Sequence, residues 1–355
     1  IGQIGVYGAR SANFAIQNSD LLLSIGSRLD TRQTGNHPQT FARAAIKIAV
    51  DIDKAELTKD WVKIDLPIEA DAKVFITEIS GQLKNIELPI VSKWWQKIGD
   101  WQKRFPVILP EFYKQKGSVN PYIFIKALSG KLESDDIILV DSGGTTVFTF
   151  QAFKVKKGQR LINTLGNFTM GYAITASIGA WFATGKKRII CIVGDGAMQM
   201  NIQELQTIAH HKIPVKIFLV NNHSYGIVKQ FQDIYFDGRY EGTSRQKGYS
   251  CPDFLKIAKD YGLTASSIKT HSNIDEKITQ VLSVKGPSLC EILIDDNQKI
   301  IPKLAAVKTA KGYVARPIED QIPYLPREEL RATMIIPLTE DSKDEILTSQ
   351  NNRNN

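Results

Sequence analysis

Two short polar motifs in the second half of the chain could together hold a metal-bound anion. Gly194-Asp195-Gly196 follows one apolar, β-branched run, Asn221-Asn222 follows the next, and the 24 residues from 197 to 220 separate them. Carboxylate, amide and carbonyl oxygens suit Mg²⁺, a hard octahedral cation. Glycines let backbone N–H groups approach an anion, and a helix expected to begin near Asn201 would add the positive end of its dipole. The motifs therefore predict a site that holds a diphosphate through a divalent metal.

A parallel sheet is needed to bring these two motifs together. The segment between them fits one crossover helix, which places both motifs at the carboxyl edge of the same sheet. Four apolar runs predict its strands, at residues 137–141, 188–193, 215–220 and 290–295. Helical patterns flank these runs, at residues 121–129, 171–184, 202–211 and 253–262. Strands that alternate with helices predict a doubly wound, Rossmann-like α/β domain over residues 119–298.

A second α/β unit precedes this domain. A helix is expected at residues 11–18, before a buried parallel strand. Apolar runs predict three strands in all, within residues 19–30, 45–53 and 62–71. The helical pattern of residues 72–83 has an apolar face made of Val74, Ile76, Ile79 and Leu83. Residues 1–85 are therefore predicted to be the later part of a second Rossmann-like domain.

The remaining segments connect and extend the two units. Residues 86–118 contain Trp94, Trp95 and Trp101 but no strand pattern, which predicts a linker with one helix packed across a domain surface. Residues 299–355 are predicted to be a C-terminal tail, with a short helix after Pro326. The last residues, TSQNNRNN, are expected to be disordered because they have nothing apolar to bury.

Composition argues against several other classes of protein. The 355 residues include 45 Lys and Arg against 37 Asp and Glu, a formal charge of +8. The basic residues are scattered among acidic ones, which does not favour a nucleic-acid partner. Cys191, Cys251 and Cys290 are widely spaced, so neither a disulfide framework nor a zinc site is predicted, and a cytoplasmic location is expected. Every apolar run is far shorter than the roughly 20 residues of a membrane span.

The strings around the two motifs resemble the thiamine diphosphate (ThDP)-dependent decarboxylase and carboligase family. The paired motifs are similar to the family's cofactor motif, and LGNFTMG at residues 165–171, followed by YAITASIGAWFATG, is similar to a second family segment without its usual proline. In the first unit, IGQIG, SDLLLSIGSRLDTRQTG and VDIDKAEL resemble the central domain of acetolactate synthase large subunits. The resemblance implies a central and a diphosphate-binding domain, with the family's N-terminal pyrimidine-binding domain absent.

The resemblance also implies a role for individual residues. Asp195, the side chain of Asn222 and the backbone carbonyl of Ser224 would be the Mg²⁺ ligands. Met170 would be the bulky apolar residue that forces the cofactor to bend. Further cofactor contacts would come from Gly144, Thr145, Phe168, Thr169, Gly194, Gly196, Ala197, Tyr225 and Gly226.

Two further implications concern the first unit and the tail. Arg28, Asp51 and Asp71 match positions that contact FAD in acetolactate synthases, so FAD is a second candidate cofactor. The alternative is that Asp51 is a strand-end carboxylate on a solvated loop. The tail would close the site as a lid, because its apolar residues need a surface to cover. They are Tyr324, Leu325, Met334, Ile335 and Ile336, and the alternative is a solvated extension.

Three features depart from the family pattern. The glutamate that activates ThDP lies in the family's N-terminal domain, and neither Glu204 nor Glu241 has a matching context, so the isolated chain is expected to be inactive. Phe231 occupies the substrate-pocket position where acetolactate synthases have Trp. Gly144 and Thr145 stand where the family usually has Gln and His. The last two departures point to an altered substrate pocket.

The predicted function is decarboxylation of a 2-keto acid such as pyruvate and carboligation to an acceptor carbonyl, in a homodimer or homotetramer. One alternative is a related ThDP carboligase or decarboxylase with another substrate, for instance in a sugar or surface-polysaccharide pathway. The other is a ThDP-binding module without catalysis. Neither a nucleic acid nor a membrane is expected as a partner.

Overall fold

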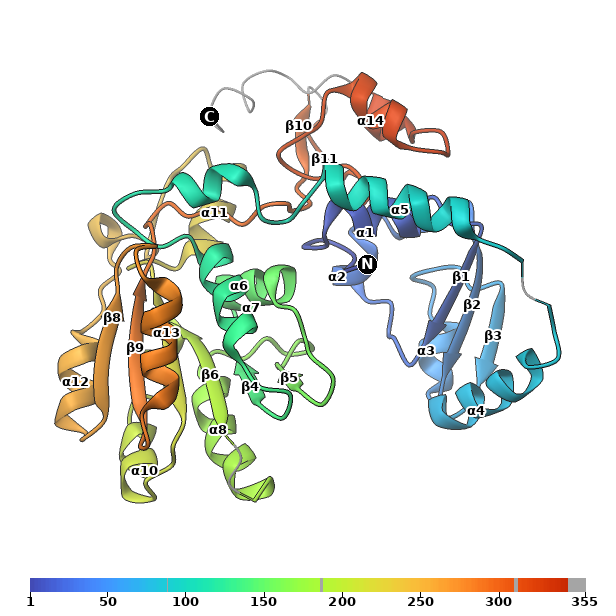
Figure 1. The fold of residues 1–355 in the computed structure, drawn as a ribbon. Coiled ribbons are helices and arrows are strands. Elements are labelled where there is room, and N and C mark those ends of the chain that lie inside the picture. The colour runs from blue at the N-terminus through green and yellow to red at the C-terminus, as the bar shows by residue number, and fades with distance from the viewer. Residues whose placement is uncertain (88, 186–187, 310–311, 344–355) are drawn as a thin grey trace. The chain divides into compact units, whose positions relative to one another are not determined.

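The computed structural model describes residues 1–87, 89–185, 188–309 and 312–343, which fall into two compact units (Figure 1). Unit 1 combines Ile1–Val107 with the segment that begins at Ile301, and unit 2 is Ile108–Ile300. From Ile301 onward, the described residues of the predicted C-terminal tail are part of unit 1, whereas Lys299 and Ile300 are part of unit 2. TSQNNRNN lies outside the described residues.

Unit 2 is built on a six-stranded parallel sheet in the order β5-β4-β6-β7-β9-β8. The strands are β4 (Ile137–Val140), β5 (Arg160–Ile162), β6 (Ile189–Gly194), β7 (Lys216–Asn221), β8 (Thr264–Ile268) and β9 (Ser288–Leu293). All four predicted strands are confirmed. The two additional strands lie at the sheet edges, where one has only three residues and the other, TASSI, is largely polar.

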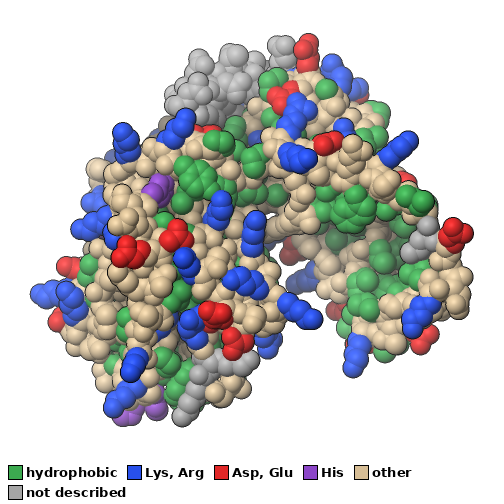
Figure 2. Space-filling model, in the orientation of Figure 1, with side chains coloured by type: hydrophobic (Ala, Val, Ile, Leu, Met, Phe, Trp, Pro, Cys, Tyr) green, Lys and Arg blue, Asp and Glu red, His purple; other side chains and the backbone are tan. Residues whose placement is uncertain are grey.

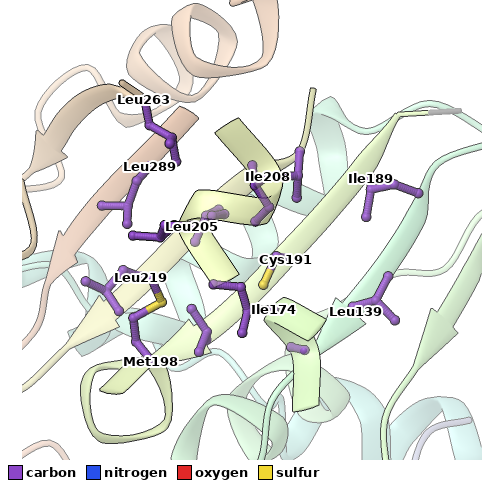
Figure 3. Packing of buried hydrophobic residues seen from close by; sticks show 14 of the residues in the cluster. Leu139, Ile174, Ile189, Cys191, Met198, Leu205, Ile208, Leu219, Leu263 and Leu289 are labelled. Carbon is purple, nitrogen blue, oxygen red and sulfur yellow. The ribbon is translucent and has the colours of Figure 1, made fainter. Parts of the chain in front are cut away.

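Helices cover both faces of this sheet. They are α6 (Pro121–Lys131), α7 (Gly144–Ala152), α8 (Tyr172–Ala183), α9 (Asp195–Met200), α10 (Glu204–His210), α11 (Gly226–Tyr235), α12 (Phe254–Asp260) and α13 (Ile274–Ser283). On one face, Ile174 of α8 and Leu205 of α10 pack against Cys191 and Leu219 of the strands (Figure 3). On the other face, Phe124 of α6 contacts Phe218 of β7, with 5.5 Å between ring centroids. The predicted doubly wound architecture is confirmed.

Unit 1 contains a smaller parallel sheet, β1-β2-β3, formed by Leu21–Ile25, Ile46–Asp51 and Leu66–Glu69. Its short helices are α1 (Arg10–Gln17), α2 (Thr31–Thr34), α3 (Lys54–Thr58) and α4 (Ala72–Leu83). The expectation that the first strand is buried is wrong, because Leu21 and Leu23 are 55% and 41% exposed. Ile46 on β2 and the α4 face around Val74 are also exposed, and Figure 2 shows hydrophobic side chains on the surface of this unit.

The connector helix and the tail pack together within unit 1. Helix α5 (Ser92–Arg104) lies in the connector, and β10 (Val307–Thr309), β11 (Gly312–Val314), α14 (Arg327–Thr333) and α15 (Glu340–Lys343) lie in the tail. Trp101 of α5 packs with Phe14 of α1 and Leu330 of α14 in one buried cluster. None of the helices in the described ranges is long and apolar enough to cross a membrane.

Candidate functional site

A cavity of about 120 Å³ lies at the carboxyl edge of the unit 2 sheet. It is formed where β4, β6, β7 and β9 end, as expected for a ligand site in a doubly wound fold. Eleven of the predicted cofactor residues line it: Gly144, Thr145, Met170, Gly194, Asp195, Gly196, Ala197, Asn222, Ser224, Tyr225 and Gly226. Phe168, Thr169 and Phe231 are not among the lining residues.

Asp195 is the only charged side chain among the described residues that line this cavity. It begins α9 directly after β6, and Met198 anchors that helix in the core beside Leu219 (Figure 3). The helix expected near Asn201 is α10, which begins at Glu204, but the helix end at the cavity is the start of α9 at Asp195.

The carboxyl group of Asp195 is buried and incompletely satisfied. The residue is 3% exposed, and its Oδ2 atom has no hydrogen-bond partner among the described residues. Burial raises the pKa of Asp195 to about 6, against the opposing effects of the Tyr249 hydroxyl and the amides of Gly196 and Ser224. Buried polar groups are normally paired, so an unpaired carboxylate oxygen facing a cavity indicates a position for a cation.

The two asparagines at the end of β7 have different roles: Asn221 holds the loop, and Asn222 lines the cavity. Asn221 is fully buried, donates from Nδ2 to Glu291 Oε1 at 2.7 Å and accepts from the backbone N–H of His223 at 2.9 Å. These bonds fix the loop that carries Asn222 and Ser224 into the cavity lining. The Ser224 hydroxyl bonds away from the cavity wall, to the carbonyl of Thr243 at 2.6 Å.

A close approach of two segments requires glycine at position 196. A Cβ atom there would lie 2.3 Å from Cε1 of Tyr225, well inside contact distance. The Tyr225 ring is itself held by an edge contact with Tyr249, with centroids 4.7 Å apart. Gly196 therefore lets the start of α9 and the start of α11 meet over the same cavity.

The other predicted side chains occupy distinct places. Met170 is partly buried, packs against the unit 2 core and lines the cavity. The Thr145 hydroxyl donates to the backbone carbonyl of Ser142, three residues earlier, at 2.9 Å. Phe231 is 48% exposed on α11 and packs against Tyr235 and Phe236.

This donor set fits Mg²⁺ held by mixed oxygen ligands. Within the described ranges, no group of three or more His, Cys, Asp or Glu side chains could hold a metal. A cation here would combine the single carboxylate of Asp195 with the Asn222 amide oxygen and a backbone carbonyl, which suits Mg²⁺ because this ion keeps several waters and substrate phosphate oxygens as ligands.

The carboxyl edge of the unit 1 sheet does not offer comparable free groups. Arg28 and Asp51 line a cavity of only about 10 Å³ there. Glu56 pairs with both Arg28, at 2.9 Å, and Lys59, at 2.6 Å. Asp51 accepts from the N–H of Asp53, and the predicted third residue, Asp71, caps α4. Each of the three residues thus has a partner within unit 1, and FAD binding at this edge stays a prediction.

Several lining residues were not predicted from the sequence. Ser142 and Ile294 follow β4 and β9, so the rule that ligands bind where parallel strands end would have identified both. Gln298 and Ile300 come from an irregular segment, where no periodic pattern marks them. Tyr249 beside Asp195 also lies outside regular structure and carries no sequence pattern.

Comparison with known proteins identifies the family. Residues 141–292 match the thiamine pyrophosphate enzyme C-terminal TPP binding domain, and residues 1–79 match the thiamine pyrophosphate enzyme central domain. The acetolactate synthase large subunit of Cyanidium caldarium is 34% identical over 313 residues, which cover 87% of this chain and 52% of that protein. The acetolactate synthase isozyme 1 large subunit of Escherichia coli (strain K12) is 31% identical over 303 residues, 85% of this chain and 52% of that protein.

The chain thus spans about half the length of the curated relatives that it matches. Each matched domain lies within one of the two units, and all cavity-lining residues except Ile294, Gln298 and Ile300 fall within the matched C-terminal domain. The chain therefore belongs to the thiamine pyrophosphate (thiamine diphosphate) enzyme family, with that family's central and C-terminal domains.

Proposed function

We propose that unit 2 binds the diphosphate of ThDP through Mg²⁺ at the carboxyl edge of its sheet. The observation that carries this proposal is the unpaired, buried Oδ2 atom of Asp195 in a cavity that Asn222 and Ser224 also line. The Asp195 carboxylate, the Asn222 amide oxygen and the Ser224 carbonyl would hold the metal. Backbone N–H groups at Gly196 and Ala197 would face the diphosphate oxygens.

The apolar part of the cavity would hold the rest of the cofactor. Phe148, Met170, Ile227, Ile294 and Ile300 line it, so the wall away from Asp195 is largely hydrocarbon. These side chains exclude water and hold the organic part of the cofactor in one orientation. When bound, ThDP supplies a thiazolium carbon acid that can remove CO₂ from a 2-keto acid and transfer the remaining acyl unit.

For the whole protein we propose decarboxylation of a pyruvate-like 2-keto acid followed by carboligation, in a homodimer or homotetramer. Relatives named acetolactate synthase large subunit support this activity, although the chain matches only about half of their length. All three cysteines are free, which supports a reducing, cytoplasmic location.

We propose further that the chain binds ThDP but needs an activating carboxylate from another segment. The described residues that line the cavity include no glutamate. Glu204 pairs with Thr207 on α10, and Glu241 is exposed in a loop. A general base must lie within hydrogen-bond reach of the proton that it moves, and neither glutamate lines the site.

The test is product analysis on the chain combined with the N-terminal domain of a relative, supplied with ThDP, Mg²⁺, pyruvate and a series of acceptor carbonyls. Acetolactate as the product supports the leading proposal. Product from another acceptor would replace it with a related carboligase, a result that the exposed Phe231 and the Gly144–Thr145 pair would then explain. ThDP binding with neither CO₂ release nor C2 proton exchange would replace it with a binding module.

A further inference from the structure

A buried carboxylate outside the cavity connects the segments that form its walls. Asp141 directly follows β4, is fully buried and does not line the cavity. Its Oδ1 accepts the N–H groups of Ser142, at 2.9 Å, and Gly171, at 3.0 Å, and its Oδ2 accepts the N–H of Ala173 at 2.8 Å. One side chain thus ties the turn after β4 to the segment after Met170.

Gly171 is held on its other side as well. Asn201, the residue directly after α9, donates from Nδ2 to the carbonyl of Gly171 at 3.1 Å. The backbone of Gly171 has φ of +82°, and a Cβ atom there would lie 2.6 Å from Asn201 Nδ2. Because α9 begins at Asp195, the peptide at Gly171 links the end of β4 to the helix that carries the proposed metal ligand.

We propose that Asp141 is a positioning residue for the cofactor: through Gly171 and Ala173 it fixes Met170 in the cavity wall, and through Ser142 it fixes Gly143 and the start of α7. This inference rests on the proposed ThDP function and assigns to it a residue that makes no cofactor contact. A carboxylate is required because both oxygens face N–H donors, whereas an asparagine would turn its own NH₂ group toward one of them.

The same strand supplies a matched control at its other end. Asp136 precedes β4, is 2% exposed and also accepts three bonds, from Arg188 Nε at 2.7 Å, Arg188 Nη2 at 2.6 Å and the N–H of Glu133 at 2.6 Å. It lies at the amino end of the sheet, where none of the described cavity-lining residues is found. Asp136→Asn therefore removes a buried carboxylate without disturbing the cavity walls.

The experiment measures ThDP affinity at saturating Mg²⁺ by titration calorimetry, together with thermal unfolding and amide hydrogen exchange, in the full chain. Substitution of residues that orient the direct contacts of a ligand typically lowers affinity by about 10- to 100-fold. Asp141→Asn should therefore weaken ThDP binding by at least about tenfold. It should also speed exchange at Gly171 and Ala173. Asp136→Asn should lower the unfolding temperature and leave affinity within about threefold.

Equal losses of affinity in Asp141→Asn and Asp136→Asn would overturn the proposal, since both would then act through stability. Unchanged affinity in Asp141→Asn would overturn it as well. If Asp141→Asn does not fold, Asn201→Ala takes its place and must also weaken ThDP binding; it removes the bond to the Gly171 carbonyl together with a long, exposed bond from Gln203 Nε2. If the wild-type chain binds no ThDP, the proposed function fails, and exchange at Gly171 still tests whether Asp141 holds this segment.

Discussion

The two ends of the unit 2 sheet differ in whether their buried charged side chains have hydrogen-bond partners. At the amino end, Asp136 forms a bidentate pair with Arg188, and the Lys216 ammonium group donates to the carbonyls of Val284 and Gly286. At the carboxyl end, Asp141 is paired with backbone N–H groups, but Oδ2 of Asp195 has no hydrogen-bond partner among the described residues. Paired groups hold the fold together, whereas the unpaired oxygen of Asp195 is available to a ligand.

The carboxyl edge of the unit 1 sheet differs from that of unit 2. Arg28 and Lys59 both pair there with Glu56, and the cavity that they line is about 10 Å³. Strand topology brings polar residues together at both edges. What distinguishes the edge in unit 2 is a buried carboxylate that the protein leaves unpaired.

The largest expected effect is on stability at the amino end. Asp136→Ala leaves Arg188 without its partner and should lower the free energy of unfolding by about 3 kcal/mol, the low end for a broken buried pair because Arg188 is partly exposed. ThDP affinity should stay within about threefold. Denaturant unfolding measures the first quantity, with the exposed neighbour Asp135→Ala as control. A loss no greater than that of the control would contradict the structural role of this pair.

At the carboxyl end, Asp195→Ala should have the opposite effect: it should weaken ThDP binding and leave stability unchanged or higher. Removing the carboxylate should weaken Mg²⁺-dependent ThDP binding by at least about 100-fold, equivalent to about 3 kcal/mol. The ligand-free chain should not become less stable, because an unpaired buried carboxylate costs free energy in the folded state. Calorimetry and denaturant unfolding test the two statements, with Asp260→Ala as an exposed control. Wild-type affinity in Asp195→Ala would refute the site assignment.

A smaller effect is expected where α9 meets α11. The Cβ atom of Gly196→Ala would displace the Tyr225 ring, and overpacking of this kind costs about 1–3 kcal/mol. ThDP affinity should fall by about tenfold, which corresponds to about 1.4 kcal/mol. Gly179→Ala on α8 meets no neighbouring atom within 4 Å and should leave affinity unchanged. Equal affinities of the two variants would show that Tyr225 can move without affecting the cavity.

The last expected effect is a pH dependence at the amino end. Burial lowers the pKa of Lys216 to about 8, so between about pH 8 and 10.5 the unfolded chain binds more protons than the folded one. Stability from this group therefore rises with pH in that window. Lys216→Met should show a smaller rise than the wild type in denaturant unfolding between pH 7.5 and 10, because Lys303, whose pKa burial also lowers to about 8, keeps its own contribution; the exposed control Lys256→Met should keep the full rise. Parallel profiles of wild type and Lys216→Met would contradict the assignment.

Strand-end chemistry in unit 2 could be predicted because it depends on local patterns. Continuous apolar runs predict the central strands, and polar residues directly after them, Asp195 and Asn222, then fall at one edge by topology alone. The edge strands could not be predicted, since an exposed edge needs neither length nor an apolar face. In unit 1, the same apolar pattern predicts strands correctly but not their burial, because Leu21 and Leu23 remain exposed.

The site features that could not be predicted from the sequence depend on hydrogen bonds between residues far apart in the chain. Asp141 follows a predicted strand, yet its importance lies in bonds to Gly171 and Ala173, about 30 residues away in the chain. Tyr249, beside Asp195, likewise comes from an irregular segment. Conversely, Arg28 and Asp51 have the right residue types for a nucleotide, and only their ion pairs and backbone bonds show that they are satisfied already.

The most direct test of the central claim is calorimetric titration of ThDP into the wild-type chain, with Mg²⁺ and then with a chelator, beside a titration of thiamine. A diphosphate held through a metal at Asp195 predicts saturable one-to-one binding of ThDP with Mg²⁺, at least about 100-fold weaker binding in the chelator and weak binding of thiamine in both. Equal ThDP affinity with and without the metal, or thiamine that binds as tightly as ThDP, would contradict it.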